Sequence, residues 1–430
     1  MNAMQIIAGL ITLTAASSYI NHRFIKLPKS IGLTLITFFF SLFLLAITQI
    51  NLYWDMQLDL DKHAVAFMDG VEFNKTFLHG MLSFLLFAGA LHINLDELAK
   101  HRWMIILLST VSVIVSTFLV GYGTWFLMSF LGLKLSIYYC LVFGALISPT
   151  DPIAVLGLMK TIGAPKSLEL KIAGESLFND GMGLVLFVIL YDIAQSSGQN
   201  IDLSSTQVMM HLIWSGGGGI AFGMVLGIAS TKILKGIDNY EVSVLVTLSI
   251  VTAGYLIADD LMGVSGVVSI SVAGLIIGTS LRYSQISRVT LHRLDAFWEL
   301  IDEVMNAILF VLIGLEFVRV SFTGLTFSAV FGIIALVLIS RFISVLIPIA
   351  FLSLFKNINR NLVWILTWGG LRGGISIALA LSLNQNIQER DLILTITYAV
   401  VIFSILVQGL TVGPFVRKMI KKEKNSGDNF

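Results

Sequence analysis

The chain has 430 residues, of which 56% are hydrophobic and only 12% are charged, and its formal net charge is +1. Soluble proteins carry roughly 25% charged residues, so a soluble domain of this length would expose large apolar patches and aggregate. The composition therefore excludes a soluble enzyme, a disordered chain and a nucleic-acid-binding protein. The single cysteine, Cys140, also excludes an intramolecular disulfide framework and a cysteine-based metal cage.

Apolar runs long enough to cross a bilayer, about 20 residues each, recur along the whole chain. In chain order they cover residues 3–20, 30–50, 76–94, 103–130, 136–159, 173–193, 207–231, 242–258, 263–281, 297–317, 325–353, 362–383 and 392–416. These runs predict an all-α polytopic membrane protein with about 13 transmembrane helices. The transmembrane domain is expected over residues 1–417, with a short cytoplasmic tail over 418–430.

The basic residues between these runs predict the orientation. The first run has no basic residue before it, which argues against a signal peptide, and His22, Arg23 and Lys26 follow it. With the N-terminus outside, the inside segments hold 20 of the 27 Lys and Arg residues and the outside loops hold five, as the positive-inside rule requires. The two that remain, Arg341 and Arg372, fall inside predicted spans and need buried partners. We expect a multi-pass protein of the plasma membrane with a cytoplasmic C-terminus.

The fifth run contains Ser148-Pro149-Thr150-Asp151-Pro152, with two of the six prolines of the chain. Each proline removes a backbone donor and clashes with the preceding turn, so the run predicts an interrupted helix. Interrupted helices form the binding sites of many transporters, and Asp151 can cap the freed N–H groups. A simple proline kink is the alternative, but a kink alone does not need a carboxylate.

The sixth run begins with a polar stretch, Gly174-Glu175-Ser176-Leu177-Phe178-Asn179-Asp180-Gly181. Helical spacing places Glu175 and Asn179 on one stripe and Ser176 and Asp180 on the adjoining one. The second stripe offers a hydroxyl and a carboxylate, which suit a hard cation. The alternative is a solvated loop ahead of the span.

The twelfth run contains Gly369-Gly370-Leu371-Arg372-Gly373-Gly374. Glycine weakens a helix and permits unwinding, so this run predicts a second interrupted helix. It lies seven runs after the first interruption, and an odd offset reverses topology, as an inverted repeat requires. We expect a buried ion pair between Arg372 and Glu175. The alternative is a glycine packing face with Arg372 reaching the interface.

Weaker signals lie in the tenth and eleventh runs. Arg341 has two candidate acidic partners, Asp259 and Glu299. Glu299 opens the tenth run with Asp302 and Glu303, and Asn306 follows one turn later; the helix dipole alone favours acids there. The seven histidines show no ligand spacing, so no structural metal is expected.

A buried carboxylate beside a hydroxyl and freed carbonyls can hold a proton or a monovalent cation, but not both comfortably. Such a site, exposed alternately to the two sides of the membrane, exchanges one for the other. If Asp180 alone titrates while Glu175 stays ionised against Arg372, the exchange is electroneutral. No cofactor is expected beyond the transported ions.

The three motifs, together with Gly263-Val264-Ser265-Gly266 and the Trp298-Glu299…Asn306 stretch, resemble the cation/proton antiporter-1 family of sodium/proton exchangers, of the prokaryotic NhaP type. The resemblance implies a homodimer with inverted repeats and two crossed, unwound helices. It also implies a core that includes residues 136–193 and 325–416, a scaffold of the remaining helices that forms the dimer, and elevator-like exchange of Na⁺, Li⁺ or K⁺ for H⁺.

By motif match, the resemblance makes Asp180 the carrier of cation and proton, with Ser176, the Thr150 carbonyl and Asn179 as further ligands. Asp151 is expected at the helix crossing and is also a predicted cation-binding residue. The Asn179-Asp180 order is similar to that of electroneutral members. One departure is Ala88, where some members have an acid, which leaves the ion selectivity open.

Three other functions fit the sequence less well. An ion channel would need a repeated filter segment, and a membrane hydrolase would need a nucleophile with a base or a metal; the sequence shows neither. An organic-anion carrier would need basic groups in the site, which Arg372 could supply if Glu175 did not neutralise it.

Overall fold

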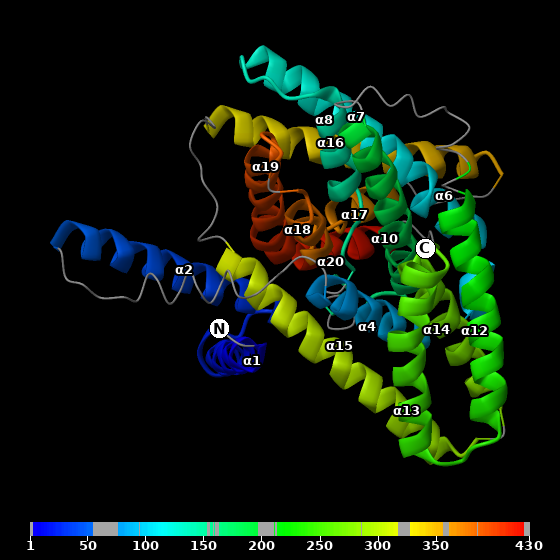
Figure 1. Cartoon of the computed structure of the whole chain (residues 1–430). Coiled ribbons are helices and arrows are strands. Elements are labelled where there is room, and N and C mark those ends of the chain that lie inside the picture. The colour runs from blue at the N-terminus through cyan, green and yellow to red at the C-terminus, as the bar shows by residue number, and fades with distance from the viewer. Residues whose placement is uncertain are drawn as a thin grey trace.

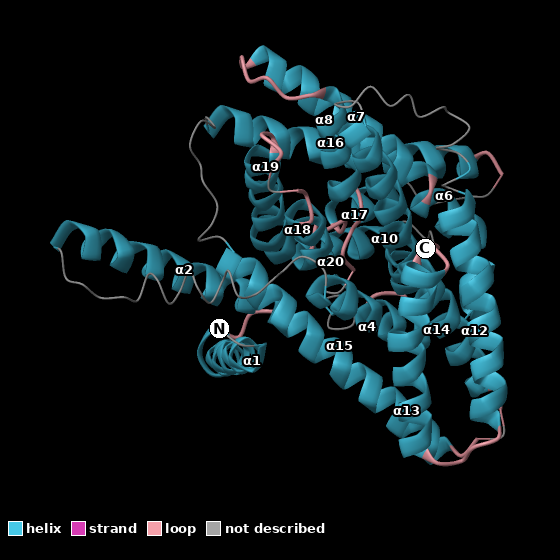
Figure 2. Cartoon of the chain, in the orientation of Figure 1, coloured by secondary structure: helices cyan, strands magenta, loops and turns pink. Residues whose placement is uncertain are grey.

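The computed structural model describes residues 3–54, 76–93, 95–152, 155–157, 159, 163–196, 210, 213–284, 286–316, 327–355, 361–384 and 386–424. Within these ranges every regular element is a helix, so the all-α prediction is confirmed (Figure 2). The α-helices are α1 (Ala3–Ile20), α2 (Lys29–Trp54), α4 (Thr76–His92), α5 (Leu95–Lys100), α6 (Arg102–Ser109), α7 (Val111–Phe130), α8 (Ile137–Ile147), α10 (Lys166–Ser196), α12 (Gly218–Lys235), α13 (Tyr240–Ser249), α14 (Gly266–Arg282), α15 (Arg288–Glu316), α16 (Phe327–Ser353), α17 (Asn361–Trp368), α18 (Gly374–Leu381), α19 (Arg390–Phe403) and α20 (Gly409–Lys424). Short π-helical turns are η1 (Asn21–Ile25), η2 (Ile213–Gly217), η3 (Ile250–Gly254), η4 (Ile257–Leu261) and η6 (Ser404–Gln408).

Each predicted apolar run contains described helical residues, and the runs 136–159 and 362–383 also contain the non-helical residues 148–152 and 369–373. Among the described residues, six helices are individually long and apolar enough to cross a membrane, and Met4–Ile25 with Lys29–Leu44 form a further pair bent by 109°. The Asn21 side chain closes this bend: its Nδ2 donates to the Leu27 carbonyl at 2.9 Å and its Oδ1 accepts from the Leu27 N–H at 3.2 Å. The number of about 13 spans stays a prediction.

The helices α10, α17, α18 and α20 lie in the middle of the molecule, while α1 and α2 lie at its edge (Figure 1). The long helix α15 runs diagonally from α1 and α2 to α13, with α4 along its middle, while α12, α13 and α14 stand together at one end. On the other side α7, α8 and α16 pack together, and α17, α18, α19 and α20 lie between these groups. The fold thus brings helices of residues 137–196 beside helices of residues 361–424.

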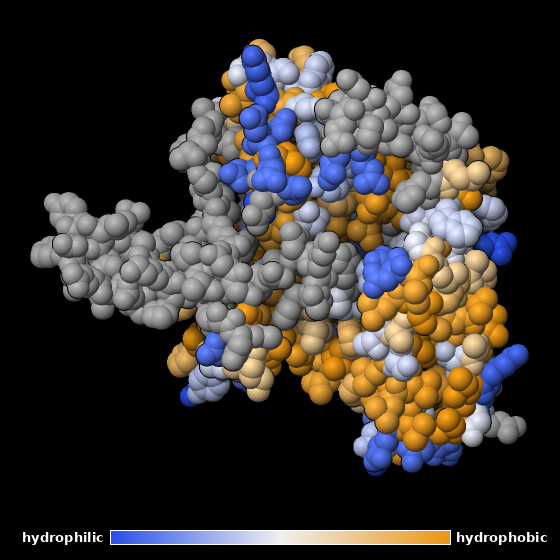
Figure 3. All heavy atoms as spheres, in the orientation of Figure 1, coloured by the Kyte–Doolittle hydropathy of each residue, from blue (hydrophilic) through white to orange (hydrophobic). Residues whose placement is uncertain are grey.

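The outer faces of the helices are apolar. Figure 3 shows hydrophobic side chains gathered over α12 and α13, where Val225 and Leu245 are exposed. A soluble protein does not leave such faces in water, whereas lipid solvates them. The outer surface is therefore that of a membrane protein.

Close packing of α7 on α8 fixes the helix that leads into the site. A Cβ added to Gly144 would lie 2.2 Å from the Thr117 carbonyl oxygen, and one added to Gly121 would lie 2.7 Å from a Leu141 methyl carbon. Small residues allow the two backbones to approach in this way. The buried end of α8, from Cys140 to Ile147, is consequently held in the protein interior.

Candidate functional site

Two helices are interrupted and cross at their interruptions, as the sequence predicted. The helix α8 ends at Ile147 and is followed by the non-helical residues 148–152, while residues 369–373 separate α17 from α18. The Asp151 N–H donates to the Leu371 carbonyl at 2.7 Å, in an isolated antiparallel bridge. The two unwound segments are therefore held directly against each other.

The crossing requires glycine on the second segment. A Cβ added to Gly373 would lie 2.4 Å from Asp151 Oδ2 and 2.6 Å from Asp151 Cβ. At Gly374 it would lie 2.5 Å from the Leu309 side chain of α15. A side chain at Gly373 would displace Asp151, and one at Gly374 would displace the Leu309 side chain, so these glycines allow Asp151 and α15 to approach this backbone closely.

The helix α10 presents its four predicted polar residues to this crossing, and all four are buried: Glu175, Ser176, Asn179 and Asp180. They do not form a solvated loop. Asn179 Nδ2 donates to Thr150 Oγ1 at 2.8 Å, and Asn179 Oδ1 accepts from the Thr150 N–H at 3.4 Å. Ser176 Oγ donates to the Thr150 carbonyl oxygen. The structure therefore brings Thr150, Ser176 and Asn179 together.

The predicted ion pair between Glu175 and Arg372 is wrong, because the partner of Glu175 is Arg341 on α16. Arg341 Nη2 lies 2.8 Å from Glu175 Oε1 and 3.1 Å from Oε2, and both side chains are no more than 3% exposed. Asn179 Nδ2 donates to the same Oε1 at 3.0 Å. The predicted partners of Arg341, Asp259 and Glu299, were also wrong; Glu299 is exposed on α15. Arg341 reaches Glu175 because α16 packs against α17. In this position Arg341 Nη2 also donates to the Leu366 carbonyl at 3.3 Å.

Arg372 instead binds the carbonyls that the interruption of α8 sets free. Its Nη1 donates to the carbonyl oxygens of Ser148 and of Pro149, the latter at 2.8 Å. The last carbonyls of a helix lack intrahelical partners and attract cations. The Arg372 side chain therefore adds a second link between the two unwound segments, beside the backbone bond that the Leu371 carbonyl accepts.

Two residues that the sequence analysis did not identify support Arg372. The Arg372 N–H donates to Ser404 Oγ at 2.8 Å, and Ser404 Oγ donates to Gln408 Oε1 at 2.7 Å. Gln408 Nε2 donates to the Trp368 carbonyl at 3.4 Å. Both are buried and belong to η6. The sequence feature that could have indicated this role is Gln408 itself, a polar residue within the apolar run 392–416.

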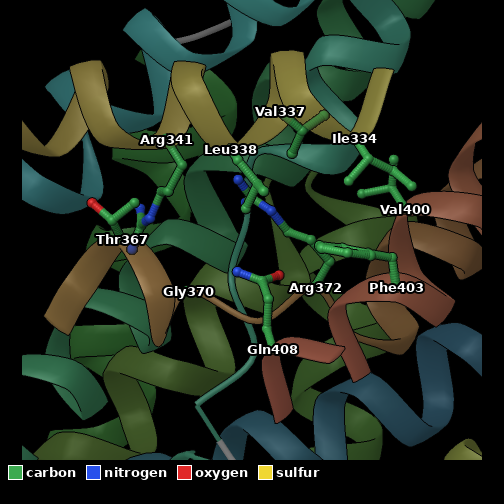
Figure 4. Close-up of a pocket in the computed structure, with 10 residues that line it drawn as sticks. All are labelled: Ile334, Val337, Leu338, Arg341, Thr367, Gly370, Arg372, Val400, Phe403 and Gln408. Carbon is green, nitrogen blue, oxygen red and sulfur yellow. The ribbon is translucent and has the colours of Figure 1, made fainter. Parts of the chain in front are cut away.

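A small pocket lies between the two arginines (Figure 4). The side chains of Arg341, Arg372 and Gln408 point into it, and Ile334, Val337 and Val400 form its apolar wall. Within the described part of the chain, Arg341 Nε and Arg372 Nη2 find no hydrogen-bond acceptor. This side of the crossing is therefore rich in donors, while the side of Ser176 and Asp180 carries the negative charge.

Asp180 differs from Glu175 although the two are less than two turns apart. Asp180 is 6% exposed, and none of the described residues donates a hydrogen bond to it or forms an ion pair with it. A buried charge without a partner is strongly disfavoured, so this carboxyl group needs a proton or a cation. Ser176 lies on the same stripe of α10 as Asp180, and its Oγ contacts the Thr150 carbonyl oxygen of the first unwound segment. The arrangement can bind either ion and cannot easily hold both.

A buried acid that has no ion-pair or hydrogen-bond partner among the described residues, beside two interrupted helices that cross, is typical of one class of protein: secondary transporters that carry small ions by alternating access. Residues 10–418 match the model of the family described as "Sodium/hydrogen exchanger, transmembrane". The chain belongs to this family, and it is a multi-pass membrane transporter rather than an enzyme.

Named relatives agree with this membership, and a solved structure shares the fold. The chain is 42% identical to the Na⁺/H⁺ antiporter NhaP of Pseudomonas aeruginosa over 97% of each chain. It is 31% identical to the Na⁺/H⁺ antiporter NhaH of Halobacillus dabanensis over 92% of this chain and 93% of that protein. The fold matches that of the sodium proton antiporter MjNhaP1 of Methanocaldococcus jannaschii with a TM-score of 0.73, at 19% identity, over 98% of this chain and 100% of the other.

Proposed function

We propose that this chain exchanges Na⁺ for H⁺ across the plasma membrane and that both ions compete for Asp180. The observation that carries the proposal is the contrast between two buried acids on α10. Glu175 is neutralised by Arg341 at 2.8 Å, whereas Asp180 has no such partner among the described residues. Glu175 is therefore structural, and Asp180 is the acid whose charge an arriving ion must balance. The names of the relatives favour Na⁺ over Li⁺ and K⁺.

The cation site consists of oxygen atoms around Asp180. Ser176 Oγ and the Thr150 carbonyl are its further ligands, and oxygen is what a hard cation prefers. Ser176 now donates to that carbonyl, so its proton turns away when a cation takes both oxygens. Asn179 holds Thr150 in register with α10 through both ends of its amide, and Asp151 adds negative charge at the crossing.

One carrier carboxylate sets the stoichiometry of transport. Asp180 carries one Na⁺ in one direction and one H⁺ in the other, while Glu175 stays ionised. The moving site then has the same charge in both directions, so the exchange is electroneutral. A second carrier acid would make it electrogenic, and the ion pair with Arg341 keeps Glu175 out of the carrier role.

The remaining expectations complete the proposed mechanism. The core, including residues 136–193 and 325–416, moves against a scaffold of the other helices, and two chains assemble through that scaffold. The N-terminus lies outside and the C-terminus in the cytoplasm, which the distribution of basic residues supports.

The test is Na⁺-driven proton flux in proteoliposomes, measured for the wild type, for Asp180→Asn and for Glu241→Gln. Glu241 is an exposed acid at the start of α13, so its variant controls for loss of a carboxylate. Flux should vanish in Asp180→Asn and persist in Glu241→Gln. Flux that survives in a folded Asp180→Asn chain would contradict the assignment.

A further inference from the structure

Two polar residues of α15 that take no part in the proposed carrier site form a cluster of oxygen atoms. Asn306 Nδ2 donates to Asp302 Oδ1 at 3.1 Å. Asn306 is only 4% exposed, and Asp302 is half-buried. Because the amide nitrogen faces the carboxylate, the amide oxygen of Asn306 points to the other side of the same cluster.

The amide oxygen of Asn306 is a buried hydrogen-bond acceptor that lacks a donor among the described residues. Among the described residues none donates a hydrogen bond to Asn306 Oδ1. A buried acceptor without a donor costs free energy, and turning the amide over would place its oxygen against the Asp302 carboxylate. The missing partner must therefore be positive or a donor, and the adjacent carboxylate favours a cation.

The cluster faces the crossing. Helical spacing places Asp302, Asn306 and Leu309 on one stripe of α15, and the Leu309 side chain packs directly over Gly374. The preceding glycine, Gly373, lies against the Asp151 carboxylate. Asp151 and Asp302 interact electrostatically, so a cation between them would relieve their repulsion.

A neighbouring acid provides a contrast. Glu303 follows Asp302 in the chain but lies on another stripe, is 53% exposed and pairs with Lys29 at 2.8 Å. Its charge is already balanced and solvated. Of these two neighbouring acids, Glu303 is therefore an ordinary surface acid, while Asp302 lies on the stripe of α15 that also carries Leu309.

We infer that the Asp302 carboxylate and Asn306 Oδ1 form an entry site for a monovalent cation, which is occupied before the ion reaches Asp180. The inference rests on the proposed antiport function. One carboxylate and one amide oxygen are few ligands for a cation, so the entry site binds weakly and releases the ion readily. Its role is to concentrate the cation beside Asp151, as charged clefts concentrate counter-ions in general.

Transport kinetics test the entry site. In proteoliposomes at fixed pH, Asp302→Asn and Asn306→Leu should raise the KM for Na⁺ about fivefold, with Vmax within about twofold of the wild type. Glu303→Gln is the matched control and should leave KM unchanged. An unchanged KM in Asp302→Asn, or a loss of Vmax at constant KM, would overturn the inference.

A binding measurement separates this site from the carrier and does not need transport. In the detergent-purified Asp180→Asn chain, ²³Na⁺ NMR line broadening should reveal weak binding, and adding Asp302→Asn should remove it. Equal broadening with and without Asp302 would overturn the entry site, while failure of the carrier proposal would appear as flux in Asp180→Asn alone. If Asp302→Asn does not fold, Asn306→Leu in the same background replaces it, with the same two outcomes.

Discussion

The guanidinium of Arg341 binds both carboxylate oxygens of Glu175, at 2.8 and 3.1 Å, and so joins α16 to α10 in the protein interior. The pair removes Glu175 from the set of acids that can carry an ion. It leaves Asp180, on the adjoining stripe of the same helix, as the buried acid that has no ion-pair partner in the part of the chain that the structure describes.

Breaking this pair should destabilise the fold more than it changes the chemistry. Arg341→Ala leaves Glu175 buried and uncompensated, which typically costs about 3–5 kcal/mol. We expect a lower melting temperature and a lower yield of folded protein in size-exclusion chromatography. The control is Lys418→Ala, an exposed residue of α20; equal melting temperatures for the two variants would refute the structural role of the pair.

Gly373→Ala should damage the crossing specifically. The new methyl group would meet the Asp151 carboxylate at 2.4 Å, so the unwound segments must separate, at a cost of about 1–3 kcal/mol typical of overpacking. Na⁺-driven flux should fall steeply. Gly89→Ala on α4 meets nothing within 4 Å and should keep full flux; comparable activity of both variants would show that close approach at Gly373 is not needed.

Asn179→Leu should uncouple α10 from the first unwound segment. The substitution removes the bonds of the amide to Thr150 and to Glu175 and leaves their polar groups unpaired, at about 1–3 kcal/mol. Because the Thr150 carbonyl is a proposed ligand, the KM for Na⁺ should rise as well. Kinetics in proteoliposomes combined with thermal melting measure both effects, and a variant that melts earlier but keeps its KM would restrict Asn179 to a structural role.

If the exchange is electroneutral, the rate of transport should not depend on the membrane potential. Potassium gradients with valinomycin can set this potential in proteoliposomes while the Na⁺ and H⁺ gradients stay fixed. The initial rate should be the same at positive, zero and negative potential. A rate that depends on potential would mean that a second group titrates or that more than one charge moves.

The sequence was sufficient to predict the interruptions and the polar helix face, because these are local. Pro149 and Pro152 cannot continue α8 without losing hydrogen bonds, and the glycines around Arg372 weaken the twelfth run. The spacing of Ser176 and Asp180 follows from helical geometry alone. These features depend on neighbours in the chain, so no tertiary information was required.

The pairing of charges could not be predicted in this way. Two arginines fall inside predicted spans, and which of them meets Glu175 depends on how α16 packs against α10 and α17. Ser404 and Gln408 were not predicted because a single serine or glutamine within an apolar run does not by itself indicate which group it binds. Their role becomes visible only when the second unwound segment lies beside η6 and presents the Arg372 N–H.

The most direct test of the central claim is to measure Na⁺-driven proton flux by the Asp180→Asn chain in proteoliposomes, together with its melting temperature. We predict that the variant folds, because Asp180 makes no ion pair within the described structure, and that its flux is abolished. A folded Asp180→Asn chain that still exchanges Na⁺ for H⁺ would contradict the account.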